Sequence, residues 1–192
     1  MEKLISELSS LAAEASACAS CRLFSGRKNA VFGDGNCLSP LFLIGEAPGR
    51  EEDAQGIPFV GRSGKLLDKL LTEEIGITRA DYYIANIIKC RPPENRNPLP
   101  DEVESCRHFI TEQIRLIKPK VILTLGNFAS QAVLESKEGI TKLRERVFDI
   151  VIGNVKVKVV PTYHPSYILR AGGMAMAEMR SDMIRVKKLL RQ

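Results

Sequence analysis

The chain has 192 residues, 44% of them hydrophobic, which is enough for one folded domain with a sizeable core over residues 1–192. Its formal net charge is +5 at pH 7 and its pI is about 9.0, which favours an acidic partner such as nucleic acid. There is no apolar run of membrane-spanning length and no basic-then-apolar leader, so we expect a cytoplasmic protein without membrane association. In that reducing compartment, five cysteines favour metal ligation or free thiols over disulfides.

Hydrophobic periodicity and turn residues divide the chain into alternating strands and helices. In the first half of the chain we expect a helix over 3–17, a buried strand over 41–44, a long loop over 50–64, a helix with Ser63 as its N-cap that ends at Gly76, and a strand over 82–88. A proline-rich loop over 89–98 leads to a helix over 100–117, a strand over 121–125 and a short helix through Leu134. The chain then forms a hairpin of strands 146–152 and 155–160, a loop over 162–170 and a last helix over 176–190. This alternation predicts an α/β fold, with helices on both faces of a sheet whose core is parallel.

The four apolar runs of the expected parallel core end in, or just before, unusual residues: Gly45–Gly49, Asn86–Pro93, Gly126-Asn127 and His164–Ser166. The carboxyl ends of parallel strands meet at one edge of a sheet, and open α/β sheets bind ligands there. The sequence therefore predicts a single site at this edge. The helix start at Ser63, flanked by glycines, is a candidate anion site beside it.

Four cysteines have the spacing of metal ligands. Cys18 and Cys21 form a Cys-x-x-Cys pair, Cys90 lies in the proline-rich loop, and Cys106 lies in the following helix. Four thiolates from three segments suit tetrahedral zinc or a 4Fe–4S cluster, and the wide second spacing favours iron–sulfur. The alternative is a buried core Cys106 with a redox pair at Cys18 and Cys21.

Taken together, these motifs resemble the family 4 (iron–sulfur) uracil-DNA glycosylases, within the uracil-DNA glycosylase superfamily. The residues that carry the resemblance are Cys18-x-x-Cys21, Gly45-Glu-Ala-Pro-Gly49, Pro58-Phe-Val-Gly-Arg-Ser-Gly64, Asn86, Cys90-Arg-Pro-Pro93, Cys106 and His164-Pro-Ser166. The resemblance implies a three-layer α/β/α sandwich around a four-stranded, mainly parallel sheet. It also implies a structural 4Fe–4S cluster on the four cysteines, no nucleotide cofactor, and a monomer that acts on uracil-containing DNA at the nucleoid.

The implied reaction is hydrolysis of the N-glycosidic bond of a flipped-out uracil, which leaves an abasic site and free uracil. His164 resembles the family histidine that donates to uracil O2, and Glu46 is the candidate to orient water or to face the sugar cation. Ala47 stands where other uracil glycosylases carry an aspartate, so the identity of a general base is open. Ala47 and Pro48 complete the uracil-binding loop.

Three further residues are expected in the uracil pocket. Asn86 can donate to O4 and accept from N3–H, the opposite of what cytosine offers; the alternative is a strand asparagine satisfied by protein partners. Phe59 resembles the aromatic residue that stacks on the base, or is plain core. Glu52 resembles the acidic residue near C5 that excludes thymine, or belongs to a solvated acidic loop.

Basic and loop residues are expected to bind DNA, with Leu169 as an apolar wedge beside the flipped nucleotide. Ordinary solvated loops and a capped helix start are the alternatives for these segments. The expected DNA contacts are Arg62, Ser63, Gly64, Lys89, Arg91, Pro165, Ser166, Leu169 and Arg170.

Two other functions stay open. One is a covalent uracil-DNA binder of the same superfamily, although the loop from Arg91 to Pro98 lacks the nucleophilic histidine of such proteins. The other is an iron–sulfur or zinc protein that only binds nucleic acid or carries electrons.

Overall fold

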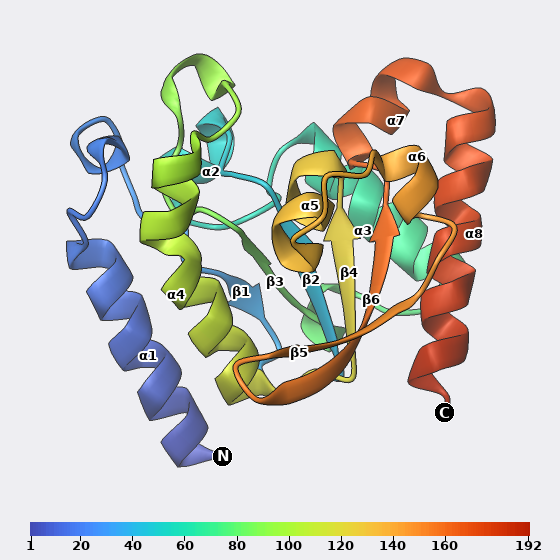
Figure 1. The fold of residues 1–192 in the computed structure, drawn as a ribbon, viewed down its shortest axis with the longest axis horizontal. Helices are drawn as coiled ribbons and strands as arrows, with labels where there is room; N and C mark the ends of the chain where they lie inside the picture. Colours follow the sequence, from blue (N-terminus) through green and yellow to red (C-terminus); the bar gives the residue numbers. More distant parts are fainter.

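The computed structural model describes residues 1–192, and its centre is a six-stranded sheet in the order β1-β3-β2-β4-β6-β5 (Figure 1). The strands are β1 (Asp34–Gly35), β2 (Leu41–Gly45), β3 (Tyr83–Asn86), β4 (Val121–Leu125), β5 (Phe148–Ile152) and β6 (Val155–Thr162). The four middle strands are parallel, while β1 and β5 pair antiparallel at the two edges. The expected four-stranded parallel sheet is thus the middle of a larger one, and the predicted hairpin at Gly153-Asn154 supplies one of the two added edges.

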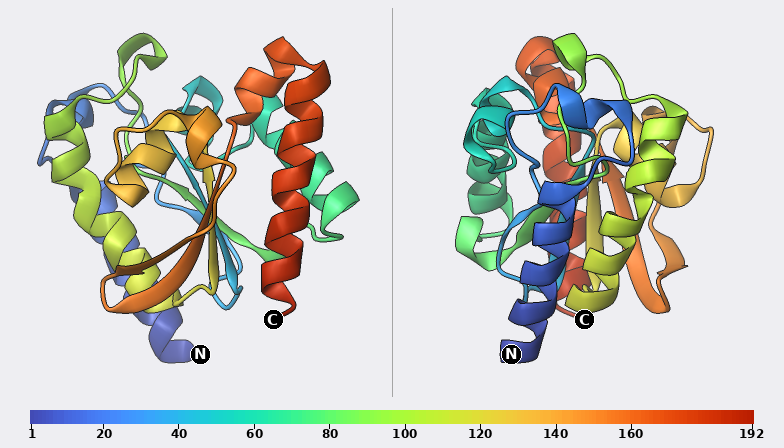
Figure 2. Two further views of the ribbon diagram at one scale, coloured as in Figure 1. Left: turned by 45° about the vertical axis from the view of Figure 1, so that its right-hand side comes forward. Right: turned by 90° about the vertical axis from the view of Figure 1, so that its left-hand side faces the viewer.

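Helices cover both faces of the sheet, as the turned views in Figure 2 show. The α-helices are α1 (Glu2–Ala17), α2 (Arg50–Gln55), α3 (Arg62–Glu74), α4 (Pro100–Ile117), α5 (Asn127–Leu134), α6 (Ile140–Leu143), α7 (Pro165–Ala171) and α8 (Gly173–Leu190). One apolar core lies between the sheet and α1, α4 and α5, and a second lies between the sheet and α3, α7 and α8. This layering confirms the predicted α/β sandwich. None of the helices combines the length and apolar character needed to cross a lipid bilayer.

Two segments expected to be loops are short helices. Within residues 50–64, α2 forms because the Glu52 carboxylate accepts from the backbone N–H of Gly49 at the helix start. Within residues 162–170, α7 begins with Pro165 at its first position and with His164 as its N-cap. The N-cap of α3 is Gly61 rather than Ser63, which lies inside the first turn.

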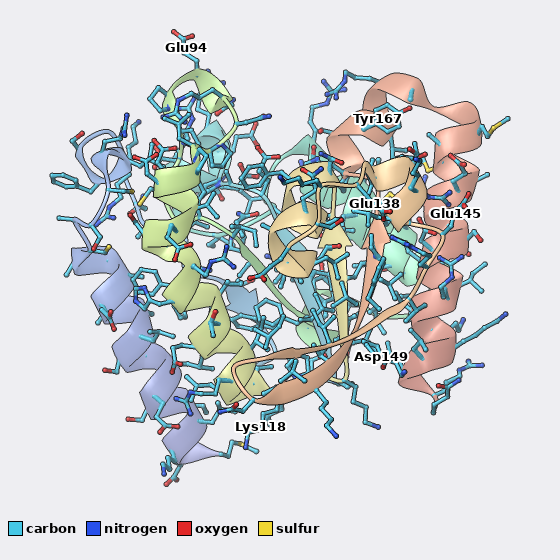
Figure 3. All side chains as sticks on the ribbon, viewed as in Figure 1. Glu94, Lys118, Glu138, Glu145, Asp149 and Tyr167 are labelled. Carbon is cyan, nitrogen blue, oxygen red and sulfur yellow. The ribbon has the colours of Figure 1, made fainter.

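The parallel register brings the predicted site segments to one edge of the sheet. Gly45 pairs with Asn86, and Leu125 pairs with Thr162, so the carboxyl ends of all four middle strands lie level. Gly126, directly after β4, lies against the side chain of His164. Figure 3 shows this end at the top, with Tyr167 on α7 near it, and Lys118 and Asp149 at the opposite end.

Candidate active site

A cavity of about 600 Å³ opens at the carboxyl edge of the sheet. It is lined by Glu46, Ala47, Pro48, Gly49, Glu52, Phe59, Ser63, Asn86, Pro92, Asn95, Arg96, Asn97, His164, Ser166, Tyr167 and Arg170. All seven residues expected to bind uracil are in this set. The prediction of one shared cavity is therefore confirmed, although the role of each residue stays a prediction.

Asn86 carries an unpaired polar atom in this cavity. Its side chain is 1% exposed, and its Oδ1 has no hydrogen-bond partner in the protein. Buried polar atoms are nearly always satisfied, so an orphan acceptor in a cavity is a position that a ligand N–H can fill. The alternative of a strand asparagine satisfied by the protein is wrong for this atom.

Gly45 permits Asn86 and Phe59 to meet. A Cβ on Gly45 would lie 2.4 Å from Asn86 Oδ1 and 2.6 Å from Phe59 Cζ, closer than any side chain tolerates. Phe59 is buried, has a left-handed φ of 57°, and presents its ring to that of His164 with centroids 5.9 Å apart. An aromatic face, an amide and an imidazole therefore border the same space.

The environment of His164 fixes where its proton lies. Its Nδ1 accepts from the backbone N–H of Ser166 at 3.1 Å and is 2.7 Å from Ser166 Oγ. Burial, assisted by the charge of Arg170, lowers the pKa of His164 to about 4. At neutral pH the ring is thus uncharged, and because Nδ1 accepts, its proton is on Nε2, which is left free to donate.

The two acidic residues of the cavity differ in their freedom. Burial raises the pKa of Glu46, and no protein group donates a hydrogen bond to its carboxylate in the way that holds Glu52. Glu52 accepts from the N–H of Gly49 at 3.1 Å and from the N–H of Gly61 at 3.1 Å, so both of its oxygens are engaged. Glu52 is therefore a fixed wall of the cavity rather than part of a solvated loop.

The two helix starts expected to contact DNA flank the cavity. On α3, Ser63 lines the cavity and Arg62 is exposed. Gly64 is buried, and its backbone packs so closely that a Cβ there would lie 1.6 Å from Phe59 O. On α7, Ser166 and Arg170 line the cavity; the side chain of Leu169 is 43% exposed, and Pro165 is buried. The buried Gly64 and Pro165 shape these segments and present no side chain to a ligand.

The expectation that Lys89 binds phosphate is wrong. Its side chain is 1% exposed, and its Nζ donates to Asn86 O and to Gln113 Oε1 inside the protein. Lys89 lies three residues after the end of β3, in a buried stretch over 87–90 that continues inward from the strand, which the proline-rich sequence after it concealed. Arg91 is half-buried and donates to Asn95 Oδ1, so it lies at the surface of the same loop.

The loop after Cys90 contributes four cavity residues that were not expected in the uracil pocket: Pro92, Asn95, Arg96 and Asn97. Arg96 is held by a bidentate pair to the fully buried carboxylate of Glu102, with N···O distances of 2.9 and 2.6 Å. Tyr167 of α7 also lines the cavity. The sequence does not place these loop residues in the pocket, because the loop is held over the cavity by its attachment to α4.

Cys18, Cys21, Cys90 and Cys106 line one small cavity between α1 and α4. Two of the sulfurs receive N–H groups: Cys106 Sγ from Lys89 N at 3.3 Å and Cys90 Sγ from Arg27 at 3.1 Å. No three His, Cys, Asp or Glu side chains form a group that could hold a single metal ion. Four sulfurs surround one space, with N–H donors at its wall. This donor set fits a cluster whose ligands bind separate iron atoms.

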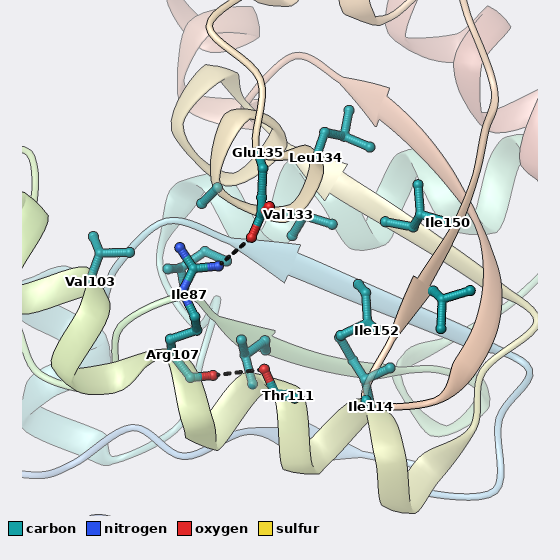
Figure 4. A pocket seen from close by; sticks show the side chains of 14 residues that line it. Ile87, Val103, Arg107, Thr111, Ile114, Val133, Leu134, Glu135, Ile150 and Ile152 are labelled. Atoms are coloured by element: carbon teal, nitrogen blue, oxygen red, sulfur yellow. Dashed lines mark hydrogen bonds and ion pairs between the residues drawn. The ribbon is translucent and has the colours of Figure 1, made fainter.

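A separate apolar cavity of about 380 Å³ lies between α4, the end of α5 and β5 (Figure 4). Its walls are mainly aliphatic, and an ion pair between Arg107 and Glu135, at 3.3 Å, crosses it. It contains none of the residues expected to bind uracil.

A family model gives the class of this protein. The model described as Uracil DNA glycosylase superfamily matches residues 32–186. This span contains every residue of the cavity at the sheet edge, and it begins after Cys18 and Cys21.

The chain is 48% identical over 154 residues to the type-4 uracil-DNA glycosylase of Thermotoga maritima, which covers 80% of this chain and 78% of the relative. It is 43% identical over 163 residues to that of Saccharolobus solfataricus, covering 83% and 76%. With the enzyme of Archaeoglobus fulgidus the identity is 41% over 166 residues, covering 84% and 83%. The chain therefore belongs to the type-4 family of the uracil-DNA glycosylase superfamily.

Proposed function

We propose that this chain is a monofunctional uracil-DNA glycosylase, which hydrolyses the bond between a flipped-out uracil and its deoxyribose and leaves an abasic site. Membership of the type-4 family supports the reaction. The main support for assigning the cavity as the uracil pocket is the unpaired Oδ1 of Asn86. This residue lines the same cavity as Phe59, Glu46 and His164.

Asn86 reads the base. Its Oδ1 accepts from uracil N3–H, and its amide N–H group donates to O4. Cytosine lacks the N3 proton and presents an amine at C4, so it would leave Oδ1 unpaired and set two donors against each other. A mispaired buried group costs about 1–3 kcal/mol, and a site built around such bonds discriminates strongly. Phe59 stacks on the base, and the fixed Glu52 closes the space beside C5 to the methyl group of thymine.

His164 and Glu46 act on the breaking bond. As the bond lengthens, negative charge grows on uracil O2 and positive charge on the sugar. The Nε2–H of neutral His164 donates to O2 and stabilises the leaving uracil anion by about 3 kcal/mol, the range of an oxyanion donor. Glu46 faces the sugar side, where its carboxylate orients a water and stabilises the cation.

DNA is held around the cavity by two helix starts and one loop. The start of α3, with Arg62 and Ser63, binds a phosphate near the lesion. On α7, Arg170 binds a phosphate, and the exposed Leu169 fills the space left by the flipped base. One copy of the chain supplies every residue of the pocket, so we propose that it acts as a monomer, on chromosomal DNA in the cytoplasm.

Cys18, Cys21, Cys90 and Cys106 would hold a 4Fe–4S cluster. When bound, the cluster would join the end of α1 to the start of α4 and fix the loop between Cys90 and Cys106, which borders the uracil cavity. Its role here is structural. The convergence of the four sulfurs on one cavity supports this ligand set.

Incubation of the purified protein with a uracil-containing oligonucleotide, followed by alkali and a gel, tests the reaction. We expect cleavage only at uracil, with the protein released unchanged. A protein–DNA adduct that survives denaturation would indicate a covalent binder, and binding without a product would indicate a non-catalytic protein. Iron analysis with absorbance near 400 nm separates an iron–sulfur cluster from zinc.

A further inference from the structure

A buried lysine connects the two proposed sites. Lys89 is 1% exposed, and its Nζ donates to Asn86 O at 2.9 Å and to Gln113 Oε1 at 2.7 Å. Both acceptors are neutral. Lys89 takes part in none of the ion pairs of the chain, so no carboxylate balances its charge.

Without an anion nearby, a lysine buried in this way gives up its proton, so its ammonium form requires a compensating negative charge. Burying an ammonium group is costly unless an opposite charge compensates for the lost hydration. The ring of Phe32, 5.7 Å from Nζ, offers a weak attraction but no net charge. No acidic side chain of the protein therefore serves as a counter-ion for Lys89.

The four-cysteine cavity supplies the missing charge. Lys89 lines that cavity, and its own backbone N–H donates to Cys106 Sγ. A 4Fe–4S core held by four thiolates carries net negative charge, because the thiolates outweigh the charge of the core. A second cation, Arg27, donates to Cys90 Sγ from the surface side. The cluster site is thus enclosed by one buried and one half-buried cation.

We propose that Lys89 is the buried counter-charge of the cluster and a positioning residue for uracil recognition. Its ammonium balances the cluster on one side, and on the other it donates to the carbonyl of Asn86, the last residue of β3. The cluster thereby stabilises the charge that fixes the backbone of the residue proposed to read uracil. This inference rests on the iron–sulfur site described under Proposed function.

The test uses the iron-loaded full chain with Lys89→Met, which keeps the length of the side chain and removes its charge. We expect a more negative midpoint potential of the cluster in film voltammetry, because a nearby cation favours the reduced form. We also expect at least a tenfold lower kcat/KM on uracil DNA. Lys69→Met, an exposed position on α3 paired only with Glu73, is the matched control and should match the wild-type protein in both measurements.

Lys89→Arg separates charge from packing. If the Met variant loses its iron while the Arg variant retains it, the charge is required, as proposed. Equal loss of iron in both variants would overturn the proposal, and so would an unchanged potential in a fully loaded Met variant. A wild-type protein that carries no iron would overturn the cluster itself together with this inference, whereas the glycosylase reaction would stand on its own assay.

Discussion

Single side chains in the pocket owe their chemistry to their neighbours. Asn86 presents an unpaired acceptor because Gly45 leaves room for its amide, and His164 presents Nε2–H because the N–H of Ser166 occupies Nδ1. Glu46 and His164 lie in the same cavity, and burial shifts their pKa values in opposite directions, each toward its uncharged form. Under the proposed function, this arrangement would place these groups where charge develops during the reaction.

Asn86→Asp should reverse the choice of base. A carboxylate cannot donate to uracil O4, but it can accept from the C4 amine of cytosine. We expect uracil excision to fall at least 100-fold and a measurable excision of cytosine to appear, both scored by alkali cleavage of matched oligonucleotides. Asn86→Ala is the control, since it should lose uracil without gaining cytosine. Full uracil activity in the Asp variant would remove Asn86 from base recognition.

His164→Ala should lower kcat about 100-fold, the equivalent of losing about 3 kcal/mol of stabilisation of the leaving group. Binding of uracil DNA should change little, because the hydrogen bond strengthens only as charge develops. Single-turnover rates and a separate binding titration measure the two quantities. A loss confined to binding would contradict the assigned role.

The pH dependence should report Glu46 rather than His164. If the Glu46 carboxylate is the active form, kcat/KM falls as pH drops through its pKa, which burial has raised above 4.5. His164 has a pKa of about 4 and stays neutral over most of this range, so it adds no loss until lower pH. Single-turnover rates between pH 4.5 and 8 should show an acid limb that Glu46→Gln abolishes; a limb that persists in that variant would assign it to another group.

At the scale of elements, the site is built where strands stop and short helices start. The parallel register sets the ends of β2 and β3 level, and α7 begins at Pro165, three residues after the end of β6. Proline at the first position and a side-chain acceptor at the N-cap fix the start of α7, so the groups that follow are held relative to the sheet.

Arg170 of α7 should contribute to DNA binding through charge alone. Arg170→Ala is expected to raise KM several-fold with little change in kcat, and to reduce the slope of log affinity against log salt concentration by about 1. Lys118→Asn, at the opposite end of the sheet, removes one positive charge at a left-handed position that asparagine tolerates. An equal effect of both substitutions would mean that only net charge matters.

At the scale of the whole molecule, the cysteines join segments that the sheet does not connect. Cys18 and Cys21 follow α1, while Cys90 and Cys106 flank the loop that lines the cavity at the sheet edge. A cluster there would constrain about 90 residues of chain, and metal binding of this kind contributes directly to folding stability.

Cys106→Ser should therefore destabilise the protein, by on the order of 3 kcal/mol, with loss of bound iron. Chemical denaturation with a parallel iron assay measures both. Cys37→Ser is the matched control, because Cys37 is partly buried but does not line the cysteine cavity. Equal stability losses in the two variants, with iron retained in both, would exclude Cys106 as a ligand.

The sequence by itself determined the alternation of strands and helices, the four strand ends that form the site, and the motifs at Gly45, Asn86 and His164. These signals are local: periodicity reports one face of an element, and glycine or proline marks where it stops. The same locality explains the errors, since a capped turn of six or seven residues, such as α2 or α7, has too little periodicity to be recognised.

Only the tertiary structure decided which side chains are buried and what they meet. The sequence around Lys89, with arginine and proline beside it, predicted a surface cation, but the buried stretch that follows β3 places it inside the protein against α4. For Glu52 the sequence left a solvated acidic loop open as an alternative, whereas its two oxygens accept from two separate backbone segments. Burial and pairing depend on residues far away in the chain, and neither composition nor spacing records those contacts.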